Sequence, residues 1–211
     1  MNDEHAPEAP SASVWLLDIA DLDAGLAAAW LAQLGESELQ RFHSFKREER
    51  RLQFLAGRML LRRVFSDAGI PRHAMSVLER PGNAPLVHTV GLVQAPHFSL
   101  SHSGHWIGCA ASNATPVGID IEIMRAGRDL GALAAHAFRA EEAEAIAALP
   151  ERERPYAFYS LWSRREAEFK LGGTPSFYHP LPHPSLAIAL CTAQPIHSSR
   201  LHIHCMRVQD C

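Results

Sequence analysis

A block of short β-type runs between residues 76 and 123, separated by turns that contain glycine or proline, is the feature that most limits what this chain can fold into. Helical sequence flanks the block on both sides, over residues 24–34, 37–67, 130–149 and 156–170. The longest of these stretches is expected to break near Ser44. Two more β-type runs, SLAIAL and RLHIHCMRV, follow the last helix. Helices and strands in separate runs predict an α+β fold, and the central runs predict an antiparallel meander.

The order of elements is similar in the two parts of the chain that meet near residue 116. A strand over residues 14–19 and its helices precede the central β-type runs, and the acidic run at residues 117–122 is followed by its own helices and strands. We therefore expect two similar α/β halves, over residues 14–116 and 117–211, behind a flexible N-terminal tail of residues 1–13. This division depends on the order of elements alone, because no residue-level repeat is clear.

Composition excludes several classes of protein. The chain has 211 residues, 47% of them hydrophobic, so it can bury a core without disulfides or structural metals. Its four cysteines, Cys109, Cys191, Cys205 and Cys211, form no CxxC pair and have no zinc-site spacing with histidine, which favours reduced thiols in a cytoplasmic protein. The N-terminal residues lack the pattern of a signal peptide, and no run of about 18 apolar residues is present, so neither secretion nor a membrane span is expected.

Positive charge is concentrated in one segment. The formal net charge of −3 argues against bulk nucleic-acid binding, but residues 41–63 carry eight basic and two acidic residues, which leaves that segment at +6 and the remainder at −9. Four of these cations lie at helical spacings of four, seven and four: Arg47, Arg51, Arg58 and Arg62. Such a stripe could bind phosphates through bidentate guanidinium contacts, or it could be a solvated helix face.

Two acidic residues alternate with apolar ones in the run VGIDIE at residues 117–122. In a strand, Asp120 and Glu122 share one face, with Cα atoms about 6.6–7 Å apart, while Ile119 and Ile121 share the other. Carboxylates this close repel each other unless a cation lies between them, and an all-oxygen pair suits Mg²⁺. The alternative is an acidic strand edge that faces solvent.

The later helical run, FYSLWSRREAEFK at residues 158–170, places Glu166 and Lys170 together beside an apolar stripe. Such a pair at i,i+4 is commonly an exposed ion pair worth about 0.3–0.5 kcal/mol. It could instead supply a third carboxylate to a metal site, with a lysine that reaches a phosphate. His102 lies between Ser101 and Ser103 where a strand meets a turn, but no GxSxG motif supports a hydrolase triad.

Taken together and in this order, the runs FSLSHSG at residues 98–104, VGIDIE at 117–122 and FYSLWSRREAEFK at 158–170 resemble the three signature motifs of 4′-phosphopantetheinyl transferases. The run AGRMLLRR at residues 56–63 is similar to the basic coenzyme A helix of the Sfp-type branch. The length also resembles that branch, in which two similar α/β halves are related by a pseudo-twofold axis, and not the half-sized trimeric AcpS type.

The resemblance implies a cytoplasmic, monomeric enzyme that transfers the 4′-phosphopantetheine arm of coenzyme A to a serine of an apo acyl or peptidyl carrier protein. Adenosine 3′,5′-bisphosphate would be released. Metal ligands for Mg²⁺ on the pyrophosphate would be Asp120, Glu122 and Glu166. By the same resemblance, Glu166 would accept the proton of the carrier serine and Lys170 would contact the α-phosphate. Coenzyme A phosphates would be bound by Arg58, Arg62, Ser101 and His102.

Three departures from the family pattern bear on this interpretation. Arg165 stands where the family commonly has lysine, and Gly82-Asn83-Ala84-Pro85 stands where relatives often show Gly-Lys-Pro. The chain also stops at Cys211, so we expect the sheet of the second half to be one edge strand short. Two alternatives follow: a coenzyme A-binding family member that has lost turnover and acts as a binding or regulatory protein, or another Mg²⁺-dependent phosphoryl or pyrophosphate enzyme.

Overall fold

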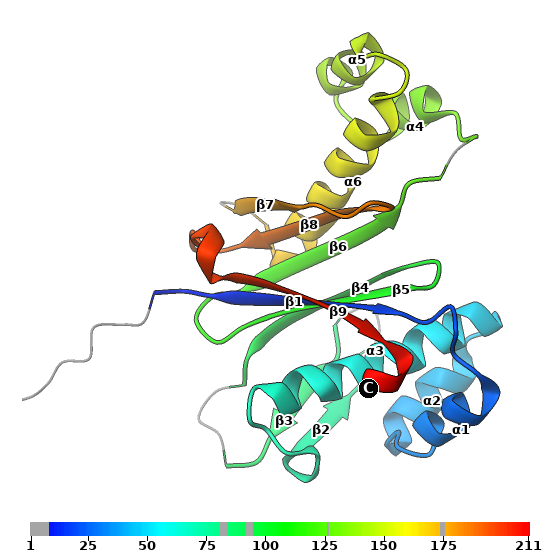
Figure 1. Cartoon of the computed structure of the whole chain (residues 1–211), viewed down its shortest axis with the longest axis vertical. Coiled ribbons are helices and arrows are strands. Elements are labelled where there is room, and N and C mark those ends of the chain that lie inside the picture. Colours follow the sequence, from blue (N-terminus) through cyan, green and yellow to red (C-terminus); the bar gives the residue numbers. More distant parts are fainter. Residues whose placement is uncertain (1–8, 81–83, 92–94, 126, 174–175) are drawn as a thin grey trace, which may run out of the picture.

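The computed structural model describes residues 9–211 except 81–83, 92–94, 126 and 174–175 (Figure 1). Its strands are β1 (Ala12–Asp18), β2 (Met75–Leu78), β3 (Leu86–Thr89), β4 (His97–Ser103), β5 (Trp106–Ser112), β6 (Val117–Ile123), β7 (Phe177–Leu181), β8 (Leu186–Thr192) and β9 (Leu201–Arg207). Its α-helices are α1 (Ala24–Leu31), α2 (Glu36–Ser44), α3 (Glu48–Asp67), α4 (Leu130–Ala137), α5 (Ala140–Ala148) and α6 (Arg154–Leu171). The mixture of helices and sheets confirms the predicted α+β class.

Most element boundaries follow the sequence pattern. The predicted break near Ser44 is confirmed, because α2 ends there and α3 begins at Glu48. The single helix expected over residues 130–149 is wrong: Phe138 and Arg139 are extended between α4 and α5, and the Glu142 carboxylate accepts the Arg139 amide. Strands β3 and β7 had no clear signal, since β3 has four residues and β7 contains Pro180.

The predicted antiparallel meander is only partly correct. Strands β4 and β5 pair antiparallel, but the other edge of β5 pairs with β1, and β6 pairs with β8 in a separate sheet. Instead of extending the sheet of β5, β6 packs on its face: a Cβ added at Gly108 of β5 would lie 3.1 Å from Ile121 Cγ2. The apolar side of β6 is therefore buried between the two sheets, with Ile119 and Ile121 inaccessible to solvent.

The two halves repeat one strand arrangement. In the first half, β1 pairs with β5, and β5 pairs with β4. In the second half, β6 pairs with β8, and β8 pairs with β7. Along the chain, a long helix separates the first of these strands from the other two in each half: α3 comes after β1, and α6 comes after β6. Figure 1 shows the larger sheets in the middle, with α1–α3 on one side and α4–α6 on the other. Similar α/β halves are therefore present.

Strand β9 departs from the expected division. It lies in the sheet of the first half, where it pairs parallel with β1, so that Trp15 is opposite His204 and the two rings stack with centroids 5.0 Å apart. The three-stranded sheet of β6, β8 and β7 accordingly has no β9 at its edge. The chain therefore crosses back to the first half before it reaches Cys211.

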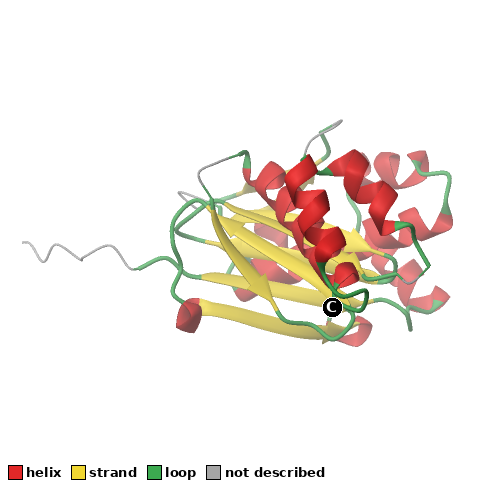
Figure 2. Ribbon diagram, turned by 90° about the horizontal axis from the view of Figure 1, so that it is seen from above, coloured by secondary structure: helices red, strands yellow, loops and turns green. Residues whose placement is uncertain are grey.

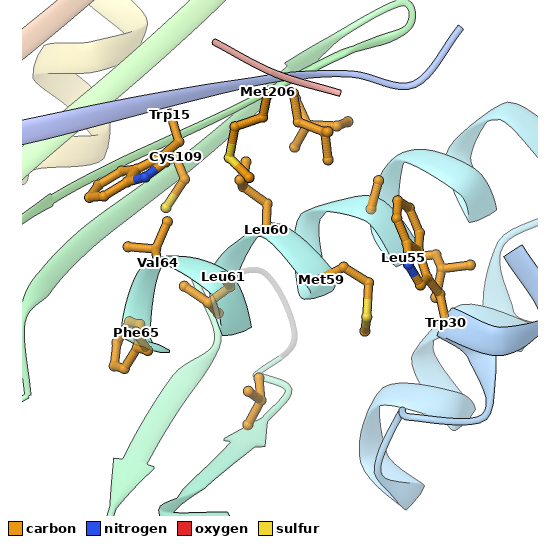
Figure 3. Close-up of a cluster of buried hydrophobic side chains, with 14 of the residues drawn as sticks. Trp15, Trp30, Leu55, Met59, Leu60, Leu61, Val64, Phe65, Cys109 and Met206 are labelled. Carbon is orange, nitrogen blue, oxygen red and sulfur yellow. The ribbon is translucent and has the colours of Figure 1, made fainter. Parts of the chain in front are cut away.

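Two packing contacts hold the long helices in place. Helix α3 points Leu60 and Val64 toward β1 and β5, where Val64 lies beside Cys109 (Figure 3). Helix α6 lies very close to β6, because a Cβ at Gly118 would be 2.1 Å from the carbonyl oxygen of Ala167. Only glycine allows this approach, which brings the polar side of α6 up to β6. Figure 2, in which the molecule is seen from above, shows helices and strands in a second view.

Candidate active site

The three motif segments meet at one cleft. Residues from β4, β6 and α6 line a cavity of about 330 Å³, namely Leu100, Ser101, His102, Asp120, Glu122, Trp162, Glu166 and Lys170. A neighbouring cavity of about 560 Å³ shares Leu100, Ser101, His102 and Lys170 with it, so the two cavities adjoin. Residues separated by up to 70 positions in the chain thus face one space between the two halves.

The strand alternation places the acidic pair as predicted. Asp120 and Glu122 line the cleft, while Ile119 and Ile121 point into the core. Asp120 is only 5% exposed, so the alternative of a solvent-facing acidic edge is wrong for this residue. A buried carboxylate must be compensated by hydrogen bonds or cations.

Lys170 supplies part of that compensation. Its Nζ lies 2.8 Å from Asp120 Oδ1 and 3.0 Å from Ser101 Oγ. The other carboxylate oxygen, Asp120 Oδ2, is buried and has no hydrogen-bond partner among the described residues. The expected i,i+4 partner of Lys170 was Glu166, but in the described part of the chain the ion pair of Lys170 is with Asp120.

The second acidic side chain of β6 has a perturbed pKa. Burial raises the pKa of Glu122, and the Asp120 charge raises it further, while the hydrogen bond from Ser103 Oγ, 2.8 Å from Oε2, opposes this shift. Because the site disfavours a second negative charge, a bound cation would stabilise the ionised form of Glu122.

The residues fit a hard divalent cation in their chemistry. The donors are oxygen atoms, one of them the unpartnered Asp120 Oδ2, and Glu166 lines the same cavity. Within the described ranges, however, no three His, Cys, Asp or Glu side chains stand close enough together to enclose a metal ion. The structure thus brings Asp120, Glu122 and Glu166 to one cleft without assembling them as a closed ligand set.

His102 lies at the boundary between the two cavities. Desolvation lowers its pKa to about 4, and the positive charges of Arg50 and Lys170 contribute to the shift. The Arg50 guanidinium contacts the imidazole ring. At neutral pH this histidine is therefore an uncharged side chain between two cations.

The two arginines expected to bind coenzyme A lie in different places. Arg58 lines the larger cavity, stacks over the Phe54 ring with its Cζ 4.4 Å from the centroid, and pairs with Glu79 at 2.6 Å. Arg62 lines a separate pocket of about 780 Å³, and its guanidinium is bonded to Glu38, a carboxylate that is 1% exposed. The structure therefore does not bring Arg62 to the cleft.

Other basic residues line the larger cavity without having been singled out from the sequence. They are Arg41, Arg50 and Arg80. The first two belong to the basic segment of residues 41–63, so charge counting points to the region but not to the side chains. Arg80 follows β2, which ends at Leu78, and had no sequence signal. The Gly82-Asn83 departure lies outside the described residues, whereas Arg80 beside it provides a cation, with its Nε donating to Ala84 O at 2.9 Å.

The Arg165 departure has a structural explanation. Its guanidinium donates to Ala137 O at 2.9 Å, pairs with Glu142 and lies over the Phe138 ring. These contacts connect α6 to α4 and α5 through several donors of one planar group, which an ammonium could not match.

Comparison with known proteins agrees with this arrangement. Residues 116–202 match the family model described as the 4'-phosphopantetheinyl transferase superfamily. The chain is 32% identical to the 4'-phosphopantetheinyl transferase AcpT of Escherichia coli O157:H7, over 69% of this chain and 77% of that protein. The chain therefore belongs to the 4'-phosphopantetheinyl transferase superfamily.

Two further relatives match over smaller shares of their length. The 4'-phosphopantetheinyl transferase HetI of Nostoc sp. is 30% identical, over 67% of this chain and 60% of HetI. The 4'-phosphopantetheinyl transferase psf-1 of Bacillus pumilus is 36% identical, over 56% of this chain and 49% of psf-1. The chain thus aligns with less than two thirds of the length of these two relatives.

Proposed function

We propose that this chain transfers the 4′-phosphopantetheine arm of coenzyme A to a serine of an apo acyl or peptidyl carrier protein and releases adenosine 3′,5′-bisphosphate. The observation that carries the proposal is the cavity lined by Asp120, Glu122, Glu166 and Lys170, which adjoins a basic cavity. The names of the relatives support the same activity. Its Sfp-type subtype, cytoplasmic location and monomeric state belong to the same proposal.

Coenzyme A would occupy both cavities. The larger one presents Arg41, Arg50, Arg58 and Arg80, whose guanidinium groups suit the 3′-phosphate and the pyrophosphate. The neutral His102 would donate one hydrogen bond to a phosphate oxygen, and its position between the cavities suits the pyrophosphate. This placement directs the phosphopantetheine end toward the smaller, acidic cavity.

Mg²⁺ would be held by Asp120 through Oδ2 and by Glu122 and Glu166, which line the same cavity. When bound, it would neutralise negative charge on the pyrophosphate. The chain's own residues account for the remaining requirements. Lys170 would exchange its contact with Asp120 for a phosphate oxygen, where its ammonium stabilises charge that develops during transfer.

The transfer step needs one base. Glu166 would accept the hydroxyl proton of the carrier serine, and the serine oxygen would form a bond to the β-phosphorus of the pyrophosphate, on the pantetheine side. The bond from that phosphorus to the bridging oxygen would break, and the bridging oxygen would leave with adenosine 3′,5′-bisphosphate. The electron pair of the broken bond stays on the leaving group, which balances the step.

The decisive experiment incubates the purified chain with coenzyme A, Mg²⁺ and an apo carrier protein, followed by intact mass spectrometry. We expect the carrier mass to rise by one phosphopantetheine group and adenosine 3′,5′-bisphosphate to appear in equal amount. Binding of coenzyme A without that mass gain would instead support the binding or regulatory alternative. Turnover of a nucleotide without any carrier would indicate another phosphoryl or pyrophosphate enzyme.

A further inference from the structure

Three alternate serines of β4 form a row of hydroxyl groups along β6. Ser99, Ser101 and Ser103 are all buried, at 5–8% exposure. Their Oγ atoms accept hydrogen bonds from the backbone amides of Ile119, Ile121 and Ile123, at 3.1, 3.2 and 3.0 Å respectively. We call this set, Ser99, Ser101 and Ser103, the serine ladder.

The ladder occupies the edge of β6 that does not pair with β8. In a strand, the backbone amide and carbonyl groups of successive residues point alternately to the two sides. The carbonyl of Pro116 and the amide of Met124 bond to residues that flank β8, so the even-numbered residues of β6 direct these groups toward β8. The amides of residues 119, 121 and 123 therefore face away from β8 and toward β4. Serine hydroxyls, not carbonyl groups, satisfy these amides, so the two sheets join without a shared backbone ladder.

Two rungs of the ladder have a second partner. Ser101 Oγ lies 2.8 Å from Asp120 Oδ1, and Ser103 Oγ lies 2.8 Å from Glu122 Oε2. Among the described residues Ser99 has no such partner, because the matching residue on β6 is Gly118, which has no side chain. Each of the two acidic residues of β6 therefore accepts a hydrogen bond from a different serine of the ladder.

The hydroxyl of Ser101 is fully used in these contacts. It accepts from the Ile121 amide and from Lys170 Nζ, and it donates to Asp120 Oδ1. A hydroxyl has one donor and two acceptor positions, so no donor remains for a coenzyme A phosphate. The role that the family resemblance implies for Ser101, a direct phosphate contact, thus conflicts with its hydrogen bonds.

We infer that the serine ladder holds β6 in place and orients its two carboxylates, with Ser101 as the positioning residue of Asp120 and Ser103 as that of Glu122. The inference rests on the proposed role of these carboxylates in holding Mg²⁺. Ser101 engages Asp120 Oδ1 and so leaves the buried Oδ2 as the free oxygen. Ser103 engages Glu122 Oε2 in the same way, so that Oε1 is the oxygen not bonded to the ladder. Hydrogen bonds to ligating carboxylates commonly set metal affinity in this manner.

The ladder provides its own matched control. Ser103→Ala and Ser99→Ala each remove one hydroxyl and leave one β6 amide without its partner, but only Ser103→Ala also releases a carboxylate. We measure Mg²⁺ binding by isothermal titration calorimetry in the presence of saturating coenzyme A, and thermal unfolding of the same samples. We expect Ser103→Ala to weaken Mg²⁺ binding about 10- to 100-fold. Ser99→Ala should leave it within about twofold, while the two variants lose similar thermal stability.

Equal Mg²⁺ dissociation constants for the two variants would overturn the inference, since they would show a purely structural ladder. If Ser103→Ala gives no cooperative unfolding transition, Ser103→Cys replaces it, because a thiol keeps the volume but donates only weakly. The carrier mass assay on the unmodified chain runs in parallel. If Ser103→Ala weakens Mg²⁺ binding more than Ser99→Ala does, but the unmodified chain gives no carrier mass gain, only the proposed function is refuted. A chain that binds no Mg²⁺ would refute the inference.

Discussion

At the scale of single residues, Lys170 defines the state of the site. Its ammonium compensates the buried Asp120 carboxylate through a 2.8 Å contact with Oδ1, while Oδ2 has no hydrogen-bond partner in the part of the chain that the structure describes. A phosphate and a divalent cation together would offer better partners to both side chains. Under the proposed function, Lys170 would hold Asp120 until substrate arrives and would then contact the phosphate.

Replacing Lys170 by alanine tests this role. We expect kcat for carrier modification to fall about 10²- to 10³-fold, because the ammonium stabilises charge that develops mainly in the transition state. The KM for coenzyme A should change by less than about tenfold, since the arginines of the larger cavity remain. Steady-state kinetics with the apo carrier would measure both constants. A rise in KM with an unchanged kcat would contradict the proposed contribution of Lys170.

A second prediction at this scale concerns His102, whose pKa is lowered to about 4 by desolvation, Arg50 and Lys170. A bound phosphate opposes those influences and raises that pKa, so more of the imidazole is protonated in the complex than in the free protein. Near pH 5.5, coenzyme A binding should therefore take up a fraction of a proton that His102→Gln does not take up. Calorimetry in buffers of different ionisation enthalpy gives this difference. Identical proton uptake by the two proteins would exclude a phosphate contact at His102.

At the scale of elements, α3 carries arginines with different functions on one helix. Arg58 faces the basic cavity, whereas Arg62 is bonded to Glu38 beneath α2. Of the four arginines predicted as one cationic stripe, Arg47 precedes α3 as its extended N-cap. Arg58 and Arg62 lie on α3 but contact different neighbours. The arginines of the stripe therefore do not form one phosphate site, and Arg58 and Arg62 do not belong to a solvated face.

Single substitutions should separate these roles. Arg58→Ala should weaken coenzyme A binding by about tenfold, and less at high salt, where the electrostatic contribution is screened. Arg62→Ala should leave coenzyme A affinity nearly unchanged but lower stability by about 3 kcal/mol, because it leaves the buried Glu38 with the more distant Arg58, at 3.7 Å. Calorimetric titration and urea unfolding of both variants check this assignment. The reverse pattern would place Arg62 in the coenzyme site.

At the scale of the whole molecule, the crossing of β9 ties the two halves together. Met206, near the end of β9, is buried in the core of the first half, where it lies next to Leu60 of α3 (Figure 3). The cleft lies at β4, at the opposite edge of this sheet from β9. Among the described residues, no helix combines the length and apolar character that a bilayer crossing requires.

Met206→Ala should therefore lower the free energy of unfolding by about 2 to 5 kcal/mol, as expected when a core methionine is truncated. Cys205→Ala is the matched control, because the neighbouring Cys205 is exposed and its change should be within about 0.5 kcal/mol. Chemical denaturation measures both. Equal, small effects would mean that β9 does not complete the first core.

The sequence by itself determined the α+β class, most helices and strands, and the face of β6 that carries Asp120 and Glu122. These features follow from the hydrophobic periodicity of the sequence, which depends only on residues a few positions apart along the chain. Only the tertiary structure decided that Lys170 pairs with Asp120, that Arg62 is bonded to Glu38, that β9 joins β1, and that the serine ladder meets β6. Each of these depends on which strand edge or buried charge finds a partner across the fold, and such partners are set by the packing of distant segments, not by spacing along the chain.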